Sequence, residues 1–295
     1  MQTIPAKSIL QRTKSLGWFG CEYNMNLYRG CCHGCLYCDS RSDCYQNPDF
    51  DTVVAKENAL AILQGEVARK VKTGVVATGA MSDPYNPFEA QEKLTQSALA
   101  LLDAYGFGVA IDTKSDLITR DIAVLTAIHS HAPVLCKLPI TTADDALAAK
   151  LEPAAPPPSA RLAALEQLAA AGLFCGVLMM PVLPFLEDSD ENVVQVVRRA
   201  AEVGARFVYP SFGVTMRAGQ REYFLDGLQR AFPQEYYAQQ YSRRYGSRYY
   251  CASPRAKHLW EVFTEACREH GLLYDMQDIV HGYRQGRESG QLSFF

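Results

Sequence analysis

The 295-residue sequence lacks the features that mark membrane-spanning and secreted proteins. It has no run of about 18 apolar residues, which excludes a typical transmembrane helix. Its first residues, MQTIPAKSILQRTK, have neither the apolar segment nor the small-residue cleavage site of a secretory signal. We therefore expect a protein of the cytoplasm with no membrane partner, in a compartment where thiols stay reduced.

An excess of one charge is also missing. The 29 basic and 32 acidic residues leave a net charge of −3, which excludes the global basic character of many nucleic-acid-binding proteins. A nucleic-acid partner would therefore need a local basic patch. The sequence has no internal repeat beyond βα units, and its 48% hydrophobic content suits a large core with a smaller appendage.

Apolar runs of strand length alternate with helical patterns, which is typical of a parallel α/β sheet. The strand candidates are 18–23, 75–78, 108–113, 134–138, 174–180 and 207–209. The helix candidates are 54–70, 91–105, 119–129, 159–171 and 189–203. Six such units without a seventh or eighth predict an open, partial (βα)6 barrel of the TIM type. In such folds the chemistry lies at the C-terminal ends of the strands.

The pattern changes after residue 212 to a tyrosine- and arginine-rich region, with a further helix predicted at 255–270. We expect an N-terminal arm at 1–17, the α/β barrel at 18–212, a helical C-terminal appendage at 213–286 and a flexible tail at 287–295.

What the sequence has in quantity is cysteine, because five of its ten cysteines lie between residues 31 and 44. Cys31, Cys35 and Cys38 form a C-x3-C-x2-C motif directly after the first strand candidate. Three thiolates so spaced on one loop could bind three irons of a [4Fe–4S] cluster and leave the fourth iron open. A structural zinc or four-cysteine site is the alternative, but no second C-x2-C pair lies at the usual distance. Cys32 and Cys44 fall outside this spacing.

This motif, after the first strand of a six-unit α/β chain, resembles the radical S-adenosylmethionine (SAM) superfamily over roughly residues 18–212. The resemblance implies that the open iron binds the amino and carboxylate groups of SAM, and that the reduced cluster cleaves SAM to a 5′-deoxyadenosyl radical. It also implies an electron donor such as flavodoxin or ferredoxin. Tyr37, just before the third cysteine, is expected near the adenine; a packing tyrosine is the alternative.

Four further stretches narrow the resemblance to the spore photoproduct lyase-like branch, which includes the lyase that reverses a thymine dimer in DNA. They are TGAMSDPYNPFE, IDTKSDLITRDIAVL, LEPAAPPPSARLAAL and MMPVLPFLED, beginning at residues 78, 111, 151 and 179. The resemblance implies that Ser82 and Asp83 hold the methionine ammonium. It also implies that Lys114 contacts the methionine carboxylate, with a solvated loop lysine as the alternative.

Two charged pairs in these stretches favour a structural interpretation. Arg120 and Asp121 are placed as a pair at a helix N-terminus. Glu152 and Arg161 could pair across the proline-rich connection between them.

The sequence departs from the lyase pattern at three positions. Ala80 stands where the lyase has a hydrogen-donating cysteine, and Asp39 stands where it has a tyrosine. Pro139 replaces a serine on the fourth strand that helps to hold SAM, although Thr141 or Thr142 could supply a hydroxyl nearby. Another hydrogen source would be required for a repair reaction: Cys251, Cys44 or a hydrogen returned from 5′-deoxyadenosine.

The end of the chain resembles the short peptide with which bacterial polymerases and repair proteins bind the DNA sliding clamp. Its residues are Gln291, Leu292, Ser293, Phe294 and Phe295. A glutamine that hydrogen-bonds and aromatic residues that fill an apolar pocket suit such docking. The alternative is a tail that folds back onto its own core.

A second indication of DNA is the mixture of arginines and tyrosines between residues 236 and 255, which could neutralise phosphates and stack on unpaired bases. The set consists of Arg243, Arg244, Arg248, Arg255, Tyr236, Tyr237, Tyr241, Tyr245, Tyr249 and Tyr250. The alternative is an amphipathic helix whose tyrosines close the barrel mouth.

The leading hypothesis is therefore a radical SAM enzyme, of lyase or DNA-repair type, that acts on a DNA lesion or modified nucleotide and is recruited by the sliding clamp. One alternative keeps the radical chemistry but makes the substrate a small molecule or peptide. Another is a non-catalytic Fe–S or zinc binding module.

Overall fold

A seven-stranded sheet forms the centre of the protein, whose computed structural model describes residues 1–285. The strand order is β10-β9-β8-β7-β6-β3-β2. Six strands run parallel: β3 (Tyr23–Met25), β6 (Val75–Thr78), β7 (Gly108–Asp112), β8 (Val134–Pro139), β9 (Phe174–Met179) and β10 (Phe207–Pro210). The short β2 (Leu10–Arg12) pairs antiparallel with β3 at one edge. The open, partial barrel predicted from the sequence is confirmed.

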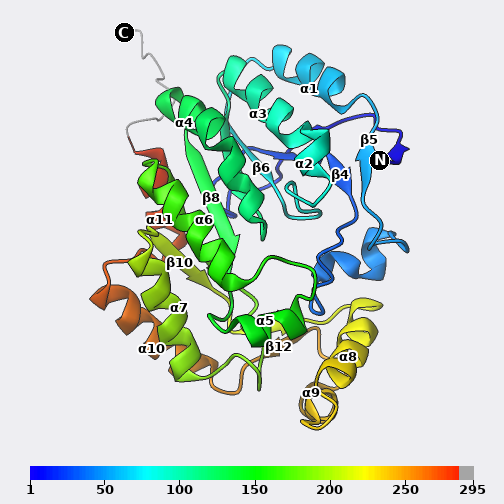
Figure 1. The fold of residues 1–295 in the computed structure, drawn as a ribbon, viewed down its shortest axis with the longest axis vertical. Coiled ribbons are helices and arrows are strands. Elements are labelled where there is room, and N and C mark those ends of the chain that lie inside the picture. Colours follow the sequence, from blue (N-terminus) through cyan, green and yellow to red (C-terminus); the bar gives the residue numbers. More distant parts are fainter. Residues whose placement is uncertain (286–295) are drawn as a thin grey trace.

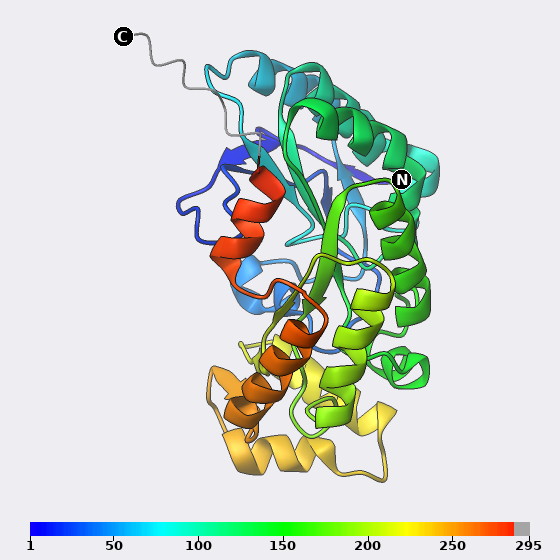
Figure 2. The same cartoon turned by 90° about the vertical axis from the view of Figure 1, so that its left-hand side faces the viewer.

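Helices that follow the strands cover the outer face of the sheet (Figures 1 and 2). They are α1 (Ala59–Ala68), α3 (Leu94–Ala104), α4 (Ile122–His131), α6 (Pro158–Ala170) and α7 (Asp190–Glu202), with short α2 (Glu89–Glu92) and α5 (Asp145–Leu151) near the strand ends. Alternate strand residues such as Val76, Val109 and Val177 pack into this outer core. Local sequence sets the helix starts: at α7, the Ser189 hydroxyl accepts a hydrogen bond from the backbone of Asn192.

The inner face of the sheet carries a second, smaller core. Ala77, Ala110, Leu135 and Phe207 pack there against α11 (Met276–Arg284), the last helix of the described chain. The loop before β3 crosses this face to the opposite edge strand. Its Phe19 and Trp18 rings lie 5.5 and 5.8 Å from the ring of Tyr209 on β10. One loop therefore joins the two edges of a sheet that hydrogen bonding leaves open.

Two predicted elements near the N-terminus were misplaced. The strand predicted at 18–23 begins only at Tyr23, because Phe19 and Gly20 adopt positive φ angles of 48° and 66° and form a turn. The helix predicted at 54–70 is instead β5 (Val54–Lys56) followed by α1. β5 pairs with β1 (Thr3–Ile4) and β4 (Tyr28–Arg29) in a separate small sheet, a long-range contact that helical periodicity does not report.

The C-terminal region packs beside the loops that leave the strands (Figure 1). It contains β11 (Gly213–Thr215), α8 (Gln220–Ala231), α9 (Tyr237–Tyr245), β12 (Tyr250–Ala252) and α10 (Ala256–Glu269). α8 contacts the 3-10 turn at Asp39–Arg41, and α10 packs on α7. Two further 3-10 turns span Asp43–Tyr45 and Asp116–Asp121. Within residues 1–285, no helix is long and apolar enough to cross a membrane.

Candidate functional site

The loop that carries the cysteine triplet leaves the first parallel strand by way of β4. Gly30 precedes the triplet at φ = 82°, and a Cβ there would lie 2.2 Å from the carbonyl oxygen of Thr52. Only glycine fits this close approach. The backbone N–H of Cys31 donates to the carbonyl of Phe50 at 2.8 Å, and that of Leu36 donates to the carbonyl of Leu151 at 2.9 Å. The loop is thus anchored at both ends of the motif.

The three motif cysteines are free thiols that lie within range of one another's charge. Burial, together with the negative charges of Asp83 and Cys38, raises the pKa of Cys31 to about 12. Burial also raises the pKa values of Cys35 and Cys38, whereas the positive charge of Lys114 opposes both shifts. These thiols would release their protons on binding a metal. Cys32 points elsewhere and packs against the outer core.

The cysteine loop fits a multi-iron cluster better than a single metal ion. In the described part of the chain, no three His, Cys, Asp or Glu side chains are arranged to hold a metal ion. Each thiolate of a [4Fe–4S] cluster binds a different iron, so its sulfur ligands stand further apart than the ligands of one zinc ion. Three mutually close thiols, of which Cys31 and Cys38 are partly accessible and Cys35 is buried, fit a cluster of this kind.

Asp83, after β6, ties three loops together. Its Oδ1 accepts hydrogen bonds from the Thr113 hydroxyl at 2.6 Å and the backbone of Tyr85 at 2.9 Å, and its Oδ2 accepts from the backbone of Lys114 at 2.9 Å. His33, inside the cysteine motif, lies 3.5 Å from Oδ2. The neighbouring Ser82 hydroxyl donates to the carbonyl of Gly30. Both residues predicted to hold the methionine ammonium lie beside the cysteine loop, with protein partners of their own.

Lys114, Tyr37, Glu152 and Arg161 form a buried cluster that we call the cysteine-side network. Glu152 accepts hydrogen bonds from the Tyr37 hydroxyl and the Arg161 guanidinium. Burial raises the pKa of Glu152, but the charges of Arg161 and Lys114 outweigh it and leave the pKa below its usual value. The Lys114 Nζ lies 3.8 Å from Glu152 and 5.5 Å from the centre of the Tyr37 ring. Lys114 is 16% exposed, so it is not a solvated loop lysine, and the predicted pairing of Glu152 with Arg161 is confirmed.

Thr141, after β8, meets a carboxyl group that sequence reasoning missed. Its hydroxyl donates to Glu187 Oε1 at 2.6 Å, and the backbone of Leu183 donates to Glu187 Oε2 at 2.9 Å. Glu187 is buried and has no ion pair in residues 1–285. Burial therefore raises its pKa to about 8. A buried carboxyl group that is largely protonated at neutral pH stands at the strand ends beside Thr141.

The two candidate hydrogen donors differ in environment. Cys251 on β12 is fully buried, in the same apolar cluster as Cys35 and Tyr37. Cys44 is exposed, with Ser42 Oγ at 3.2 Å and Arg217 Nη1 at 3.1 Å from its sulfur. These two hydrogen bonds lower the pKa of Cys44. The structure thus gives Cys44 access to solvent and denies it to Cys251.

Arg217 also joins the C-terminal region to the cysteine loop. Its Nε lies 3.1 Å from Asp39 Oδ1, and its Nη2 donates to the Tyr249 hydroxyl at 2.9 Å. Asp39 follows the third motif cysteine directly. Ala80, at the end of β6, is exposed.

Comparison with protein families agrees with this arrangement. The family model described as the radical SAM superfamily matches residues 25–206, which contain all three motif cysteines and the strands β4 to β9. The chain belongs to the radical SAM superfamily.

Curated relatives of this radical SAM enzyme occur in bacteria and archaea. The uncharacterized protein Rv2578c of Mycobacterium tuberculosis is 35% identical over 238 residues, which cover 78% of this chain and 70% of the relative. The uncharacterized protein MJ0683 of Methanocaldococcus jannaschii is 29% identical over 236 residues, covering 79% of this chain and 84% of the relative.

Solved structures of spore photoproduct lyase share the fold of this radical SAM enzyme. A lyase mutant with bound AdoMet and dinucleoside spore photoproduct superposes with a TM-score of 0.64 at 16% identity, covering 91% of this chain and 78% of that one. The methyltransferase TsrM of Kitasatospora setae, with tryptophan substrate and a SAM analogue bound, gives a TM-score of 0.53 at 12% identity, covering 86% of this chain and 52% of that one. The family implies a [4Fe–4S] cluster and SAM as cofactors.

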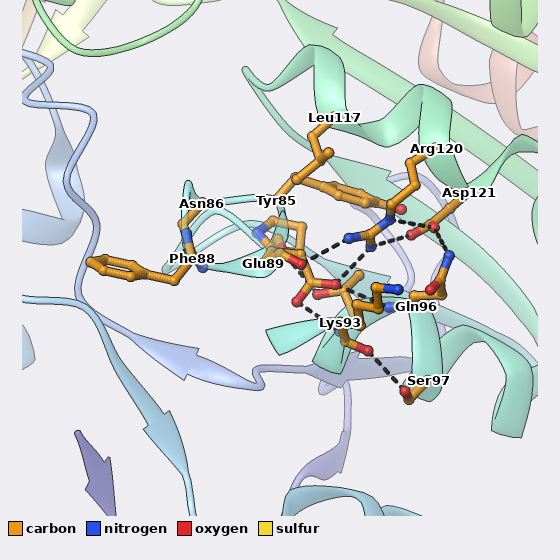
Figure 3. Close-up of polar contacts among 12 residues, drawn as sticks. Tyr85, Asn86, Phe88, Glu89, Lys93, Gln96, Ser97, Leu117, Arg120 and Asp121 are labelled. Atoms are coloured by element: carbon orange, nitrogen blue, oxygen red, sulfur yellow. Dashed lines mark hydrogen bonds and ion pairs between the residues drawn. The ribbon is translucent and has the colours of Figure 1, made fainter. Parts of the chain in front are cut away.

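A second buried network lies away from the cysteines, between α2, α3 and the turn before α4 (Figure 3). We call it the helix-side network; its members are Glu89, Gln96, Arg120 and Asp121. Arg120 donates to Glu89 Oε1 at 2.8 Å and to Asp121 Oδ1 and Oδ2 at 2.8 and 2.9 Å. Gln96 donates to Asp121 Oδ1 at 2.6 Å. The predicted pairing of Arg120 with Asp121 is confirmed, and its reach to Glu89 was not foreseen.

The arginine- and tyrosine-rich segment divides between core and surface. Tyr241 and Tyr245 of α9 are buried against Phe185 and Phe224. Arg243, Arg244, Arg248, Tyr236, Tyr249 and Tyr250 are exposed. The helix therefore packs with one face and presents a basic, aromatic surface with the other. The clamp-like peptide at 291–295 lies outside the described residues.

Proposed function

We propose that Cys31, Cys35 and Cys38 hold a [4Fe–4S] cluster, and that this radical SAM enzyme acts on a DNA lesion or modified nucleotide. The observation that carries the proposal is a triplet of free, mutually close thiols beside Lys114 and Tyr37, in a chain of the radical SAM superfamily. When bound, the cluster supplies the electron that cleaves SAM to a 5′-deoxyadenosyl radical.

The residues around the cysteine loop suit the parts of SAM. Lys114 would bind the methionine carboxylate, because its ammonium has donors to spare beyond its 3.8 Å contact with Glu152. Ser82 and Asp83 would receive the methionine ammonium with oxygen acceptors, and Thr141 would offer its hydroxyl from the end of β8. Tyr37, held by its hydrogen bond to Glu152, would pack near the adenine.

Replacement of single cysteines tests the cluster. After anaerobic reconstitution, we expect the wild type to form 5′-deoxyadenosine from SAM and dithionite, and Cys35→Ala to lose both this activity and the iron–sulfur absorbance. Cys32→Ala is the matched control, because Cys32 packs against the outer core. A wild type that binds iron but forms no 5′-deoxyadenosine would favour a non-catalytic Fe–S module.

Two observations support a nucleic-acid substrate. The fold is similar to that of spore photoproduct lyase, which has been solved with a dinucleoside photoproduct. The exposed Tyr249 contacts Arg217, which pairs with Asp39 next to the cysteine motif, and the exposed arginines of α9 lie in the same segment of the chain. Arginines can neutralise phosphates, and exposed tyrosines can stack on bases.

A filter-binding assay with single- and double-stranded DNA at low salt tests this substrate. We expect the double variant Arg243→Glu, Arg244→Glu to weaken binding and to reduce its salt dependence. The control is Arg198→Glu, Arg199→Glu on α7, which makes the same change of charge at exposed sites away from the segment. If neither DNA binds the wild type, a small molecule or peptide becomes the favoured substrate.

Because Ala80 has no thiol hydrogen to transfer, the enzyme needs another donor if it quenches a product radical. We propose Cys44 before Cys251, since Cys44 is accessible. Transfer of its hydrogen atom would break the S–H bond, form a C–H bond and leave a sulfur radical that an external thiol must quench. Cys44→Ala should then change the product that forms from the product radical. An unchanged product would favour return of a hydrogen atom from 5′-deoxyadenosine.

We also propose recruitment by the sliding clamp through the last five residues, and reduction by a flavodoxin or ferredoxin in the cytoplasm. The sequence QLSFF supports the clamp contact. A pull-down with the clamp should retain the full chain and lose a variant without residues 291–295. Equal retention of both would contradict the proposal.

A further inference from the structure

A buried ion pair lies on the inner face of the sheet, one layer below the strand ends. Asp112 on β7 pairs in register with Lys137 on β8, which pairs with Gly176 and then Phe207. In-register residues of parallel strands point to the same face. The Lys137 Nζ lies 2.9 Å from Asp112 Oδ1 and 4.4 Å from the centre of the Phe19 ring, and its side chain is fully buried.

The two oxygens of Asp112 are not equivalent. Oδ1 faces Lys137 and is buried, whereas 14% of the side chain remains exposed. Within residues 1–285, no group donates a hydrogen bond to Oδ2. The contrast is Asp83, whose carboxylate has three donors, one on its own loop and two on the loop after β7. Burial raises the pKa of Asp112 and the charge of Lys137 opposes it, so a donor to Oδ2 would relieve a desolvated carboxylate.

The surroundings of Asp112 combine close backbone packing with apolar side chains. Gly79 lies against it: a Cβ at position 79 would stand 1.9 Å from the Asp112 carbonyl oxygen. The next layer toward the strand ends holds Pro139, Leu178 and Tyr209 in register. The exposed Trp18 packs edge-to-face on Tyr209 at 5.8 Å. One free acceptor oxygen below apolar and aromatic side chains suits a flat ring with a single N–H on its edge.

We propose that Asp112 Oδ2 accepts a hydrogen bond from the ring N–H of a keto-type nucleobase and so determines which base enters the barrel. Lys137 is the positioning residue, because it occupies Oδ1 and leaves only Oδ2 for the substrate. Guanine and thymine carry such a ring N–H, whereas adenine and cytosine carry an acceptor at that place. This assignment rests on the proposed nucleic-acid substrate.

Binding of a short oligothymidylate, compared with the same oligomer methylated at N3 of every base, tests the assignment. Methylation removes the ring N–H and leaves the phosphates unchanged. The protein is the full chain, anaerobically reconstituted and saturated with SAM. We expect the wild type to prefer the unmethylated oligomer by about tenfold or more, because a hydrogen bond to a charged acceptor is lost.

The decisive variant is Asp112→Asn combined with Lys137→Gln, since the single change would leave a buried ammonium unpaired. We expect the double variant to lose the preference while it keeps its circular dichroism and its affinity for SAM. Should it fail to fold, Asp112→Leu with Lys137→Met replaces the pair by apolar side chains of similar size. Asp103→Asn, at a half-exposed carboxylate paired with His131, is the matched control and should keep the preference.

The outcomes separate the two proposals. If the wild type binds both oligomers equally, or if the double variant keeps the preference, the role of Asp112 is overturned while nucleic-acid binding stands. If the wild type binds neither oligomer but still binds SAM, the nucleic-acid substrate fails and the assignment of Asp112 fails with it.

Discussion

The protein contains two buried arginine–carboxylate networks that differ in one respect. In the helix-side network the Glu89 carboxylate receives hydrogen bonds from Arg120, Tyr28 and the backbone of Thr95 and Gln96, so its oxygens are fully used. In the cysteine-side network, Glu152 and Arg161 are paired. Within residues 1–285, the Lys114 ammonium donates no hydrogen bond and has only its 3.8 Å contact with Glu152 and its 5.5 Å contact with the Tyr37 ring.

This difference separates a network of charged groups that only stabilises the fold from one that could also bind a ligand. A network whose members satisfy one another holds helices together and has no capacity for a ligand. A network that ends in a buried ammonium with free donors retains the capacity to bind an anion. The cysteine-side network lies beside the motif cysteines, and the helix-side network does not.

We expect the largest effect, a loss of stability, when the helix-side network is broken. Arg120→Met leaves Glu89 and Asp121 buried without their cation, and we expect a loss of about 3–5 kcal/mol in the free energy of unfolding. Urea unfolding under anaerobic conditions measures it. SAM affinity of the folded fraction should stay unchanged; a stable variant with weakened SAM binding would refute the division between the networks.

In the cysteine-side network we expect the opposite result: weaker SAM binding with little change in stability. Lys114→Met should weaken SAM binding by about 1.5–3 kcal/mol, the range for hydrogen bonds to charged groups, because a methionine side chain cannot bind a carboxylate. Isothermal titration with reconstituted protein measures it. Stability should change little, since Glu152 keeps Arg161. Lys72→Met, at an exposed lysine, is the control, and equal SAM affinity in both variants would count against the role of Lys114.

Glu187 extends the comparison to a buried carboxyl group that has no arginine. Its pKa rises from 4.5 to about 8 on folding, so the folded state holds its proton more tightly than the unfolded state. Its contribution to stability is present below pH 4.5 and is lost as pH rises to about 8. Between pH 5 and 8 we expect the free energy of unfolding of the wild type to fall by on the order of 3 kcal/mol because of Glu187, and Glu187→Gln to remove this fall. Unfolding curves at the two pH values measure it, and parallel losses in wild type and variant would contradict the assignment.

The smallest effect is expected where an arginine meets an anionic group at the surface. Arg217→Met should change stability by no more than about 1 kcal/mol, because its contacts to Asp39 and Cys44 are exposed to solvent. It should instead slow alkylation of Cys44 by iodoacetamide at neutral pH, since Arg217 lowers the pKa of that thiol. Mass spectrometry of the labelled peptide measures the rate. Cys251 is the internal control, because it is buried and should remain unlabelled.

Periodicity and motif spacing predicted most of the fold. The strands β6 to β10 and the helices α3, α4, α6, α7 and α10 fall within three residues of their predicted ranges. Errors arose where long-range contacts decide local structure, as in the turn at Phe19 and in β5. The candidate site was predictable where its residues follow a motif. Glu187, Arg217 and the pair of Asp112 with Lys137 were missed, because each acquires its role from a partner distant in sequence.

The sequence alone determined the cysteine triplet, the six βα units and the superfamily, because these depend on spacing along the chain. Only the tertiary structure decided which charges have partners. It joined Arg120 to Glu89 and Glu152 to Tyr37, buried Cys251 while exposing Cys44, and left Asp112 Oδ2 without a donor in residues 1–285. The physical reason is that burial and hydrogen bonding depend on which strands and loops become neighbours. Spacing within one segment does not contain that information.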